Sequence, residues 1–212
     1  MPSASDILLG LWHIATNATR VSIAWHIVLA ASLIALLAGF RPPQRVAAAL
    51  LSAPLLSVAA LAFAFGNPFN GAVFSVLAVA LATLALRVAA SPISLRRGWS
   101  GLLGTGLIVF GAVYPHFIEG ASWLTYLYAA PLGAIPCPTL SAVIGAALIV
   151  GGFDSHAWRL TLAGAGCFYA VIGVLRLGVI MDAVLLGGAA GLVMQSIFAR
   201  SLASHSASGS QT

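Results

Sequence analysis

The stretch Val46–Phe65 reads VAAALLSAPLLSVAALAFAF and contains no charged residue. A helix rises about 1.5 Å per residue, so a run of this length reaches about 30 Å, the thickness of a bilayer's hydrocarbon core. Similar apolar runs, separated by short polar breaks, cover residues 21–40, 71–90, 101–118, 138–153, 158–175 and 180–198. The sequence therefore predicts an all-α, polytopic transmembrane helical bundle of about seven spans. These spans form a single domain over residues 1–200.

The overall composition supports a membrane protein and excludes an ordinary soluble domain. Charged residues make up 6% of the chain and the mean hydropathy is +1.06, whereas soluble proteins carry about 25% charged residues. The net charge of +5 comes from nine arginines, since there is no lysine. No basic stripe lies on a soluble face, so we expect no nucleic-acid partner. The expected partner is the lipid bilayer, while a homo-oligomer or a partner membrane subunit stays open.

The arginines predict the topology through the positive-inside bias. Residues 121–135 carry aromatic residues and a proline between Gly120 and Pro136, and about 15 residues of helix reach only about 22 Å. We therefore predict a re-entrant or interfacial segment there. Seven arginines then fall on one side of the membrane: Arg41, Arg45, Arg87, Arg96, Arg97, Arg159 and Arg200. This arrangement predicts a multi-pass protein of the cell inner membrane, with the N-terminus outside and the C-terminus cytoplasmic.

The two ends of the chain are predicted to differ from the spans. Residues 4–18 are moderately apolar and too short to cross, which favours an interfacial helix or the first turns of the first span. Residues 201–212 are rich in serine, and we expect a disordered polar tail. On the last span, Gly187 and Gly191 have the Gly-x-x-x-Gly spacing that permits close helix packing.

Polar residues gather at the predicted outer face. His116 and Glu119 follow the fourth span just after Tyr114 and Pro115. A spacing of three residues puts the two side chains on one face of a helix. Such a pair is suited to binding a divalent metal, relaying protons or acid–base work. The alternative is an interfacial capping pair.

Further candidates lie on the later spans. Cys137 stands between two prolines at a predicted helix start, where a thiol can ligate a soft metal; its alternative role is a small apolar filler. Arg176 and Asp182 flank a turn, where they either complement the helix dipoles or line a site. His26 lies in the outer third of the first span, either as a hydrogen-bonded interhelical residue or as a ligand.

Two motifs carry a resemblance to a known family. Tyr114-Pro115 precedes Pro136-Cys137-Pro138-Thr139, and a later pattern comprises Ile172-Gly173, Leu177-Gly178-Val179 and Asp182, with Gly187 or Gly188 after it. Over residues 105–195 the chain resembles an uncharacterised family of small bacterial integral membrane proteins. Arg176 stands where that pattern has a small residue. The resemblance implies the helical membrane fold and a role for Cys137, and it supplies no activity.

We expect a small inner-membrane transport or permease-like protein with an outward-facing polar pocket for a metal ion or small solute. The pocket is predicted to be lined by Tyr114, His116, Glu119, Cys137, Arg176 and Asp182, with His26 closing one side. A metal bound by His116, Glu119 and Cys137 would be a divalent or soft cation such as zinc or copper. Two other hypotheses are an intramembrane enzyme that uses these groups, and a structural or assembly subunit of a membrane complex.

Overall fold

The structure is a computed structural model that describes residues 3–117 and 122–208, and these residues form helices joined by short turns. The described residues form no β-strand, and their one β-bridge joins Pro43 to Pro92. The α-helices are α1 (Ala4–Asn17), α2 (Thr19–Leu37), α3 (Gln44–Leu50), α4 (Ala53–Ala64), α5 (Pro68–Ala85), α6 (Trp99–Ala112), α7 (Tyr126–Ala129), α8 (Pro136–Ile149), α9 (His156–Val171) and α10 (Val184–Ser208). Shorter 3₁₀ or π turns are η1 (Trp123–Thr125), η2 (Gly151–Asp154), η3 (Ile172–Arg176) and η4 (Ile180–Ala183).

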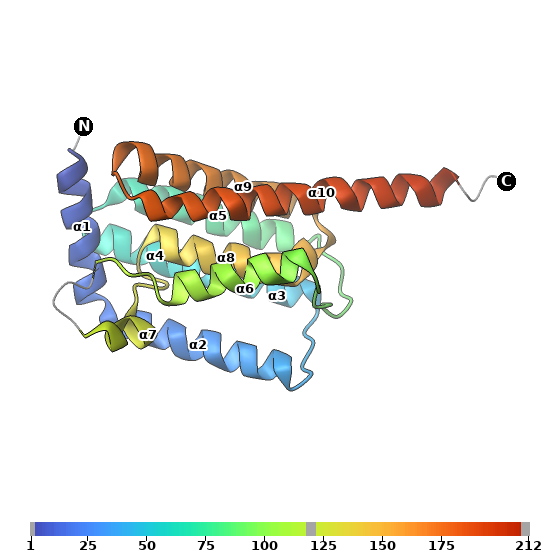
Figure 1. Cartoon of the computed structure of the whole chain (residues 1–212), viewed down its shortest axis with the longest axis horizontal. Helices are drawn as coiled ribbons and strands as arrows, with labels where there is room; N and C mark the ends of the chain where they lie inside the picture. The colour runs from blue at the N-terminus through green and yellow to red at the C-terminus, as the bar shows by residue number, and fades with distance from the viewer. Residues whose placement is uncertain (1–2, 118–121, 209–212) are drawn as a thin grey trace.

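The predicted bundle of transmembrane helices is confirmed. In the described part of the chain, five helical segments are long and apolar enough to cross a membrane: Thr19–Leu37, Gln44–Ala64, Pro68–Ala85, His156–Arg176 and Ile180–Phe198. Two shorter apolar helices, α6 and α8, run alongside them (Figure 1). The count is therefore consistent with about seven spans. The described part of the segment 121–135 forms η1 and α7 and stays at one end of the bundle (Figure 1).

Helix α8 is the centre of the bundle, which explains why its apolar run is short. Eleven of its fourteen residues are buried, as expected of a helix that is hydrophobic all round. Other helices surround it, so it need not match the lipid thickness itself. Its hydroxyls have partners inside the protein, since Ser141 donates to the Leu107 carbonyl at 2.8 Å and Thr139 to the Ile135 carbonyl at 2.7 Å.

Glycines let α6 pack directly on the backbone of α8. A Cβ atom placed on Gly104 would lie 2.6 Å from the Gly145 carbonyl oxygen, and one on Gly111 would lie 2.5 Å from the Pro138 carbonyl oxygen. Small residues allow this approach in membrane bundles. On α10, Gly188 and Gly191 lie on the face that packs against other helices. Gly187 does not, because a Cβ atom placed on it would meet nothing within 4 Å. Only Gly191 of the predicted Gly187–Gly191 pair therefore takes part in close helix packing.

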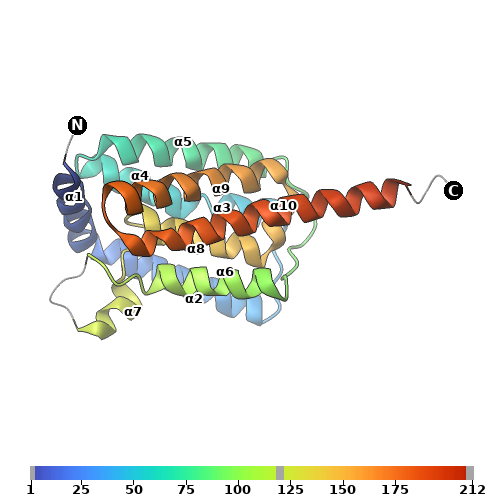
Figure 2. The ribbon, with the colours of Figure 1, turned by 45° about the horizontal axis from the view of Figure 1, so that its top comes forward.

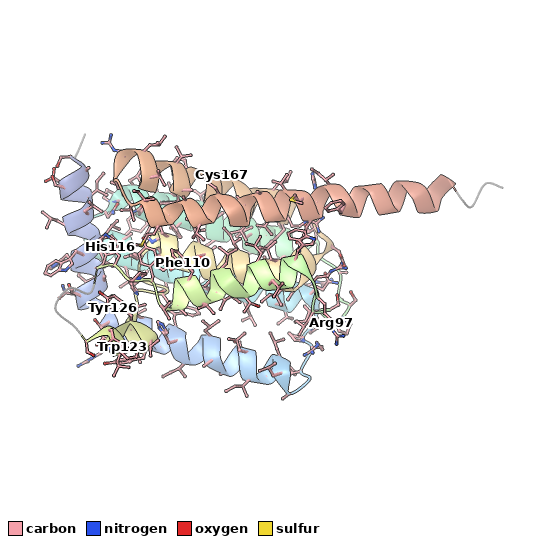
Figure 3. All side chains as sticks on the ribbon, in the orientation of Figure 1. Arg97, Phe110, His116, Trp123, Tyr126 and Cys167 are labelled. Carbon is pink, nitrogen blue, oxygen red and sulfur yellow. The ribbon has the colours of Figure 1, made fainter. Side chains whose placement is uncertain are left out.

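Most of the arginines lie at one end of the bundle, whereas Arg176 lines the cavity at the other end. Pro43 pairs with Pro92 there, and the Arg96 backbone N–H donates to the Ile149 carbonyl at 2.7 Å. Arg159 is buried at this end, where its Nε donates to the Ser196 hydroxyl at 2.8 Å. Figure 3 shows Arg97 at this end and His116 and Trp123 at the other.

The opposite end carries α1, which lies across the bundle rather than along it (Figure 2). This arrangement agrees with the predicted interfacial helix. Its first turn is held by a capping box of Ser3 and Asp6. The Ser3 hydroxyl and backbone N–H both donate to the Asp6 carboxylate, and these bonds hold the pKa of that carboxyl below its usual value. Helix α10 extends to Ser208, and residues 209–212 lie outside the described part; the disordered polar tail over residues 201–212 stays a prediction.

Candidate solute-binding cavity

The carboxylate of Asp182 is the centre of the candidate site. It is 2% exposed and lies in η4, at the start of a membrane-spanning segment. The Tyr114 hydroxyl donates to its Oδ1 at 2.7 Å, and the Cys137 thiol donates to its Oδ2 at 3.0 Å. These partners come from the segment after α6 and from the first turn of α8. Three parts of the chain therefore meet at one buried acidic group.

The backbone around Asp182 is shaped to admit that carboxylate. Gly173 lies in the π-helical turn η3, and a Cβ atom there would stand 2.2 Å from Asp182 Oδ2. Gly178 adopts φ +72 in the turn between η3 and η4, a conformation that favours glycine. The Val179 N–H then donates to the Gly173 carbonyl at 2.9 Å. The wide π turn, the absent side chain and the glycine turn together place Asp182 against the end of α9.

Cys137 reaches Asp182 because α8 begins at Pro136. Proline is favoured in the first helical turn, where its missing N–H would have no intrahelical partner. The helix start thus projects Cys137 toward the segment before α10. The predicted helix start at the Pro-Cys-Pro-Thr element is confirmed, and Cys137 has a specific polar partner.

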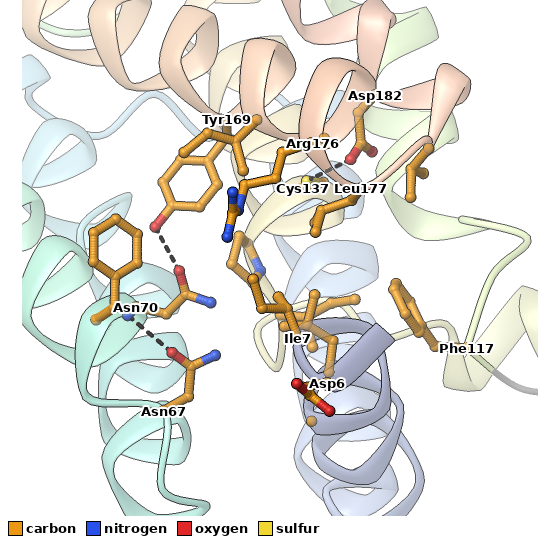
Figure 4. A pocket seen from close by; sticks show the side chains of 18 of the residues that line it. Asp6, Ile7, Asn67, Asn70, Phe117, Cys137, Tyr169, Arg176, Leu177 and Asp182 are labelled. Atoms are coloured by element: carbon orange, nitrogen blue, oxygen red, sulfur yellow. Dashed lines mark hydrogen bonds between the residues drawn. The ribbon is translucent and has the colours of Figure 1, made fainter. Parts of the chain in front are cut away.

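A cavity of about 690 Å³ lies beside this group at the α1 end of the bundle (Figure 4). Its volume lies within the range of pockets for small organic molecules. Most of the wall is apolar and aromatic. The lining residues with polar or aromatic side chains are Asp6, Phe65, Asn67, Phe69, Asn70, Tyr114, Phe117, Cys137, Tyr169, Arg176 and Asp182. Backbone and side chains of α1 line part of the wall through Ile7, Gly10 and Leu11.

A second polar group faces the same cavity, and no sequence pattern had pointed to it. The Tyr169 hydroxyl on α9 donates to Asn70 Oδ1 on α5 at 2.9 Å. The backbone N–H of Asn70 donates to Asn67 Oδ1 at 3.1 Å, which makes Asn67 the N-cap of α5. The pair Asn67-Pro68 is a recognisable helix start. The pairing of Asn70 with Tyr169, across 99 positions of sequence, has no local signal.

The predicted site residues divide into four groups, and His26 is the fourth. Tyr114 and Cys137 both bond to Asp182, and Arg176 joins them in the wall of the cavity. His116 lies in a neighbouring shallow pocket with residues 177–181, where its ring centroid is 4.0 Å from that of Phe117. Glu119 lies outside the described residues.

His26 is not among the residues that line the cavity, although it was predicted to close one side. Its ring nitrogens lie 2.8 Å from the carbonyl oxygens of Ser22 and Ala112, so it ties α2 to the end of α6. This is the interhelical alternative that the sequence left open. Next to it, the indole of Trp25 covers Gly133, where a Cβ would approach within 2.0 Å.

The described residues contain no group of three or more His, Cys, Asp and Glu side chains that could hold a metal ion. Glu119, one of the three predicted ligands, is outside that part of the chain. The metal hypothesis therefore stays a prediction.

Comparisons with protein-family models, with curated proteins and with solved structures found no match for this chain. The resemblance to an uncharacterised membrane family thus stays a prediction.

Proposed function

We propose that this chain is a small permease-like membrane protein that binds a small organic solute in the cavity beneath α1. Asp182 anchors the polar part of the solute, and the aromatic and aliphatic wall receives its apolar part. The observation that carries the proposal is a buried carboxylate that two other segments hold in the wall of a 690 Å³ cavity.

The cost of a carboxylate at this place supports a functional role. Ionisable groups inside membrane segments are expensive, and in most cases they face a cavity or a partner. An apolar residue at position 182 would avoid that cost. The chain instead supplies two donors, Tyr114 and Cys137, and a glycine that makes room for the carboxylate. Broken helices beside a polar cavity are also how many transporters present backbone and charge to a solute.

The arginine distribution supports the proposed orientation in a cell inner membrane. The basic end of the bundle faces the cytoplasm under the positive-inside bias. The cavity lies at the opposite end, beside Asp6 and Arg176, and is therefore proposed to open to the outside. The N-terminus is proposed to lie outside and the C-terminus in the cytoplasm.

An intramembrane enzyme is less well supported. That hypothesis uses His116 as the acid or base for Cys137 or Glu119, and such work requires hydrogen-bond reach. The Cys137 thiol bonds to Asp182 instead, and His116 lines the neighbouring pocket. The enzyme hypothesis requires a contact between His116 and Cys137 or Glu119, whereas solute binding requires only the contacts of Asp182 with Tyr114 and Cys137.

The test is uptake by the purified protein in proteoliposomes, with a panel of radiolabelled amino acids, primary amines and monocarboxylates. We expect uptake of at least one compound. Asp182→Asn should lower that uptake at least about tenfold, which corresponds to the free energy of about one charge-assisted hydrogen bond. Asp154→Asn is the matched control, because Asp154 is at the basic end and accepts from Gln44 at 3.0 Å. Equal uptake by Asp182→Asn, or no uptake of any compound that the protein binds, would refute the proposal.

A further inference from the structure

Four exposed arginines gather at the end of the bundle opposite the cavity, and none of them lines that cavity. They are Arg45, Arg87, Arg96 and Arg97, and Figure 3 shows Arg97 at this end. Asp154 is the one acidic residue that the described part of the chain places here, and its Oδ2 already accepts from Gln44 Nε2 at 3.0 Å. Positive charge therefore exceeds negative charge on this arginine surface.

Backbone hydrogen bonds hold the segments that carry these arginines side by side. The Arg45 N–H donates to the Ala89 carbonyl at 3.3 Å, next to the β-bridge that joins the two segments. The Arg96 N–H donates to the Ile149 carbonyl at 2.7 Å. The Arg96 side chain lies against η2, since a Cβ atom placed on Gly151 would lie 2.6 Å from its Nε. The arginine surface is thus an ordered part of the fold, held to both α3 and α8.

The arginine surface lies at the ends of membrane-spanning helices, beside exposed apolar side chains. Arg45 is the second residue of α3, Arg87 lies two residues after the end of α5, and Arg97 lies two residues before the start of α6. Leu86 and Trp99, which stand next to these positions in the chain, are 70% and 45% exposed. An amphiphile with an anionic headgroup and acyl chains can use both the charge and the apolar surface, whereas a soluble anion can use only the charge.

We propose that the arginine surface binds an anionic phospholipid, with the headgroup phosphate on the arginines and the acyl chains against the neighbouring apolar residues of α5 and α6. The leaflet concerned is the one at this end, which the proposed orientation makes the cytoplasmic leaflet. The positive-inside bias alone would explain the arginines by their effect during membrane insertion, and it predicts no preference among lipids in the folded protein. A lipid site predicts such a preference, and each arginine near the headgroups contributes about fivefold to it.

The test measures which lipid contacts Trp99 in the full-length protein. The protein is reconstituted into phosphatidylcholine vesicles that contain increasing fractions of a brominated lipid, whose bromines quench tryptophan fluorescence on contact. The Trp99 signal is the difference between the wild type and Trp99→Phe. We expect brominated phosphatidylglycerol to half-quench this signal at a fraction at least about tenfold lower than brominated phosphatidylcholine does. Trp123, which is exposed at the opposite end, should show no such preference (Figure 3).

Charge-removing variants should lower the preference for phosphatidylglycerol. The double variant Arg96→Gln with Arg97→Gln, and the double variant Arg45→Gln with Arg87→Gln, should each lower it at least about fivefold. Arg96→Lys with Arg97→Lys keeps both charges and should keep the preference, which guards against a folding defect in the glutamine variants. Arg20→Gln is the matched control, because Arg20 is exposed at the start of α2, at the α1 end of the bundle, and its loss should change nothing.

Several results would overturn the proposal. Equal quenching of Trp99 by the two lipids, or a preference that survives both glutamine pairs, would show that the arginines select no lipid. Displacement of the lipid by inorganic phosphate, at ionic strength matched with sodium chloride, would assign the surface to a soluble anion. Absence of Trp99 quenching by either lipid would show that a protein neighbour, such as a second copy of this chain, covers this face. Solute uptake enters none of these measurements, so the transport function and the lipid site stand or fall separately.

Discussion

Replacing Gly173 by alanine tests whether the π turn exists to hold Asp182. The new Cβ would lie 2.2 Å from Asp182 Oδ2 and 2.8 Å from Asp182 Cβ, far inside van der Waals contact, so the carboxylate or the turn must move. Overpacking of this kind costs about 1–3 kcal/mol. If the carboxylate moves, it also loses its bonds to Tyr114 and Cys137, and hydrogen bonds to charged groups contribute about 1.5–3 kcal/mol each. The higher helix propensity of alanine offsets up to about 1 kcal/mol of this destabilisation.

We therefore expect Gly173→Ala to lower the free energy of unfolding by at least about 3 kcal/mol. Gly164→Ala is the matched control, since it lies on the same helix and its Cβ would meet nothing within 4 Å. That change should be neutral or stabilise the protein by up to about 1 kcal/mol, through helix propensity alone.

Reversible unfolding in mixed detergent micelles, titrated with sodium dodecyl sulfate and followed by tryptophan fluorescence, measures both variants. Solute uptake in proteoliposomes gives a second readout, because a displaced Asp182 should no longer anchor the polar part of the solute. Two variants of equal stability, or a Gly173→Ala protein that takes up solute like the wild type, would show that the turn does not position the carboxylate.

Two further predictions concern packing and orientation. Gly145→Ala should destabilise the protein by about 1–3 kcal/mol in the same unfolding assay, because its Cβ would lie 2.5 Å from the Gly104 carbonyl oxygen. Gly106→Ala is the control, since a Cβ there would meet nothing within 4 Å. A similar loss of stability in both variants would contradict direct contact between α6 and α8. In intact cells that carry Cys167→Ser, a membrane-impermeant methanethiosulfonate applied from outside should modify Cys137, which lines the cavity. Modification only in inverted vesicles would reverse the proposed orientation.

The sequence alone determined the class of fold. Apolar runs such as Val46–Phe65 are long enough to span a bilayer, and their helical hydrogen bonds are obligatory there. Prolines 136 and 138 marked a helix start, and the arginines between the spans marked one end of the bundle. These features are readable because each depends on local composition or on spacing along the chain.

The tertiary structure decided which helix is central and which polar groups meet. A helix that is apolar on every side has no periodicity to show which face turns inward, so the burial of α8 could not be predicted. Tyr114, Cys137 and Asp182 were each singled out from the sequence, but only the packing of three segments makes them one group. Asn70 and Tyr169 show the limit most clearly, because each is an ordinary polar residue until α5 and α9 bring them within 2.9 Å beside a cavity.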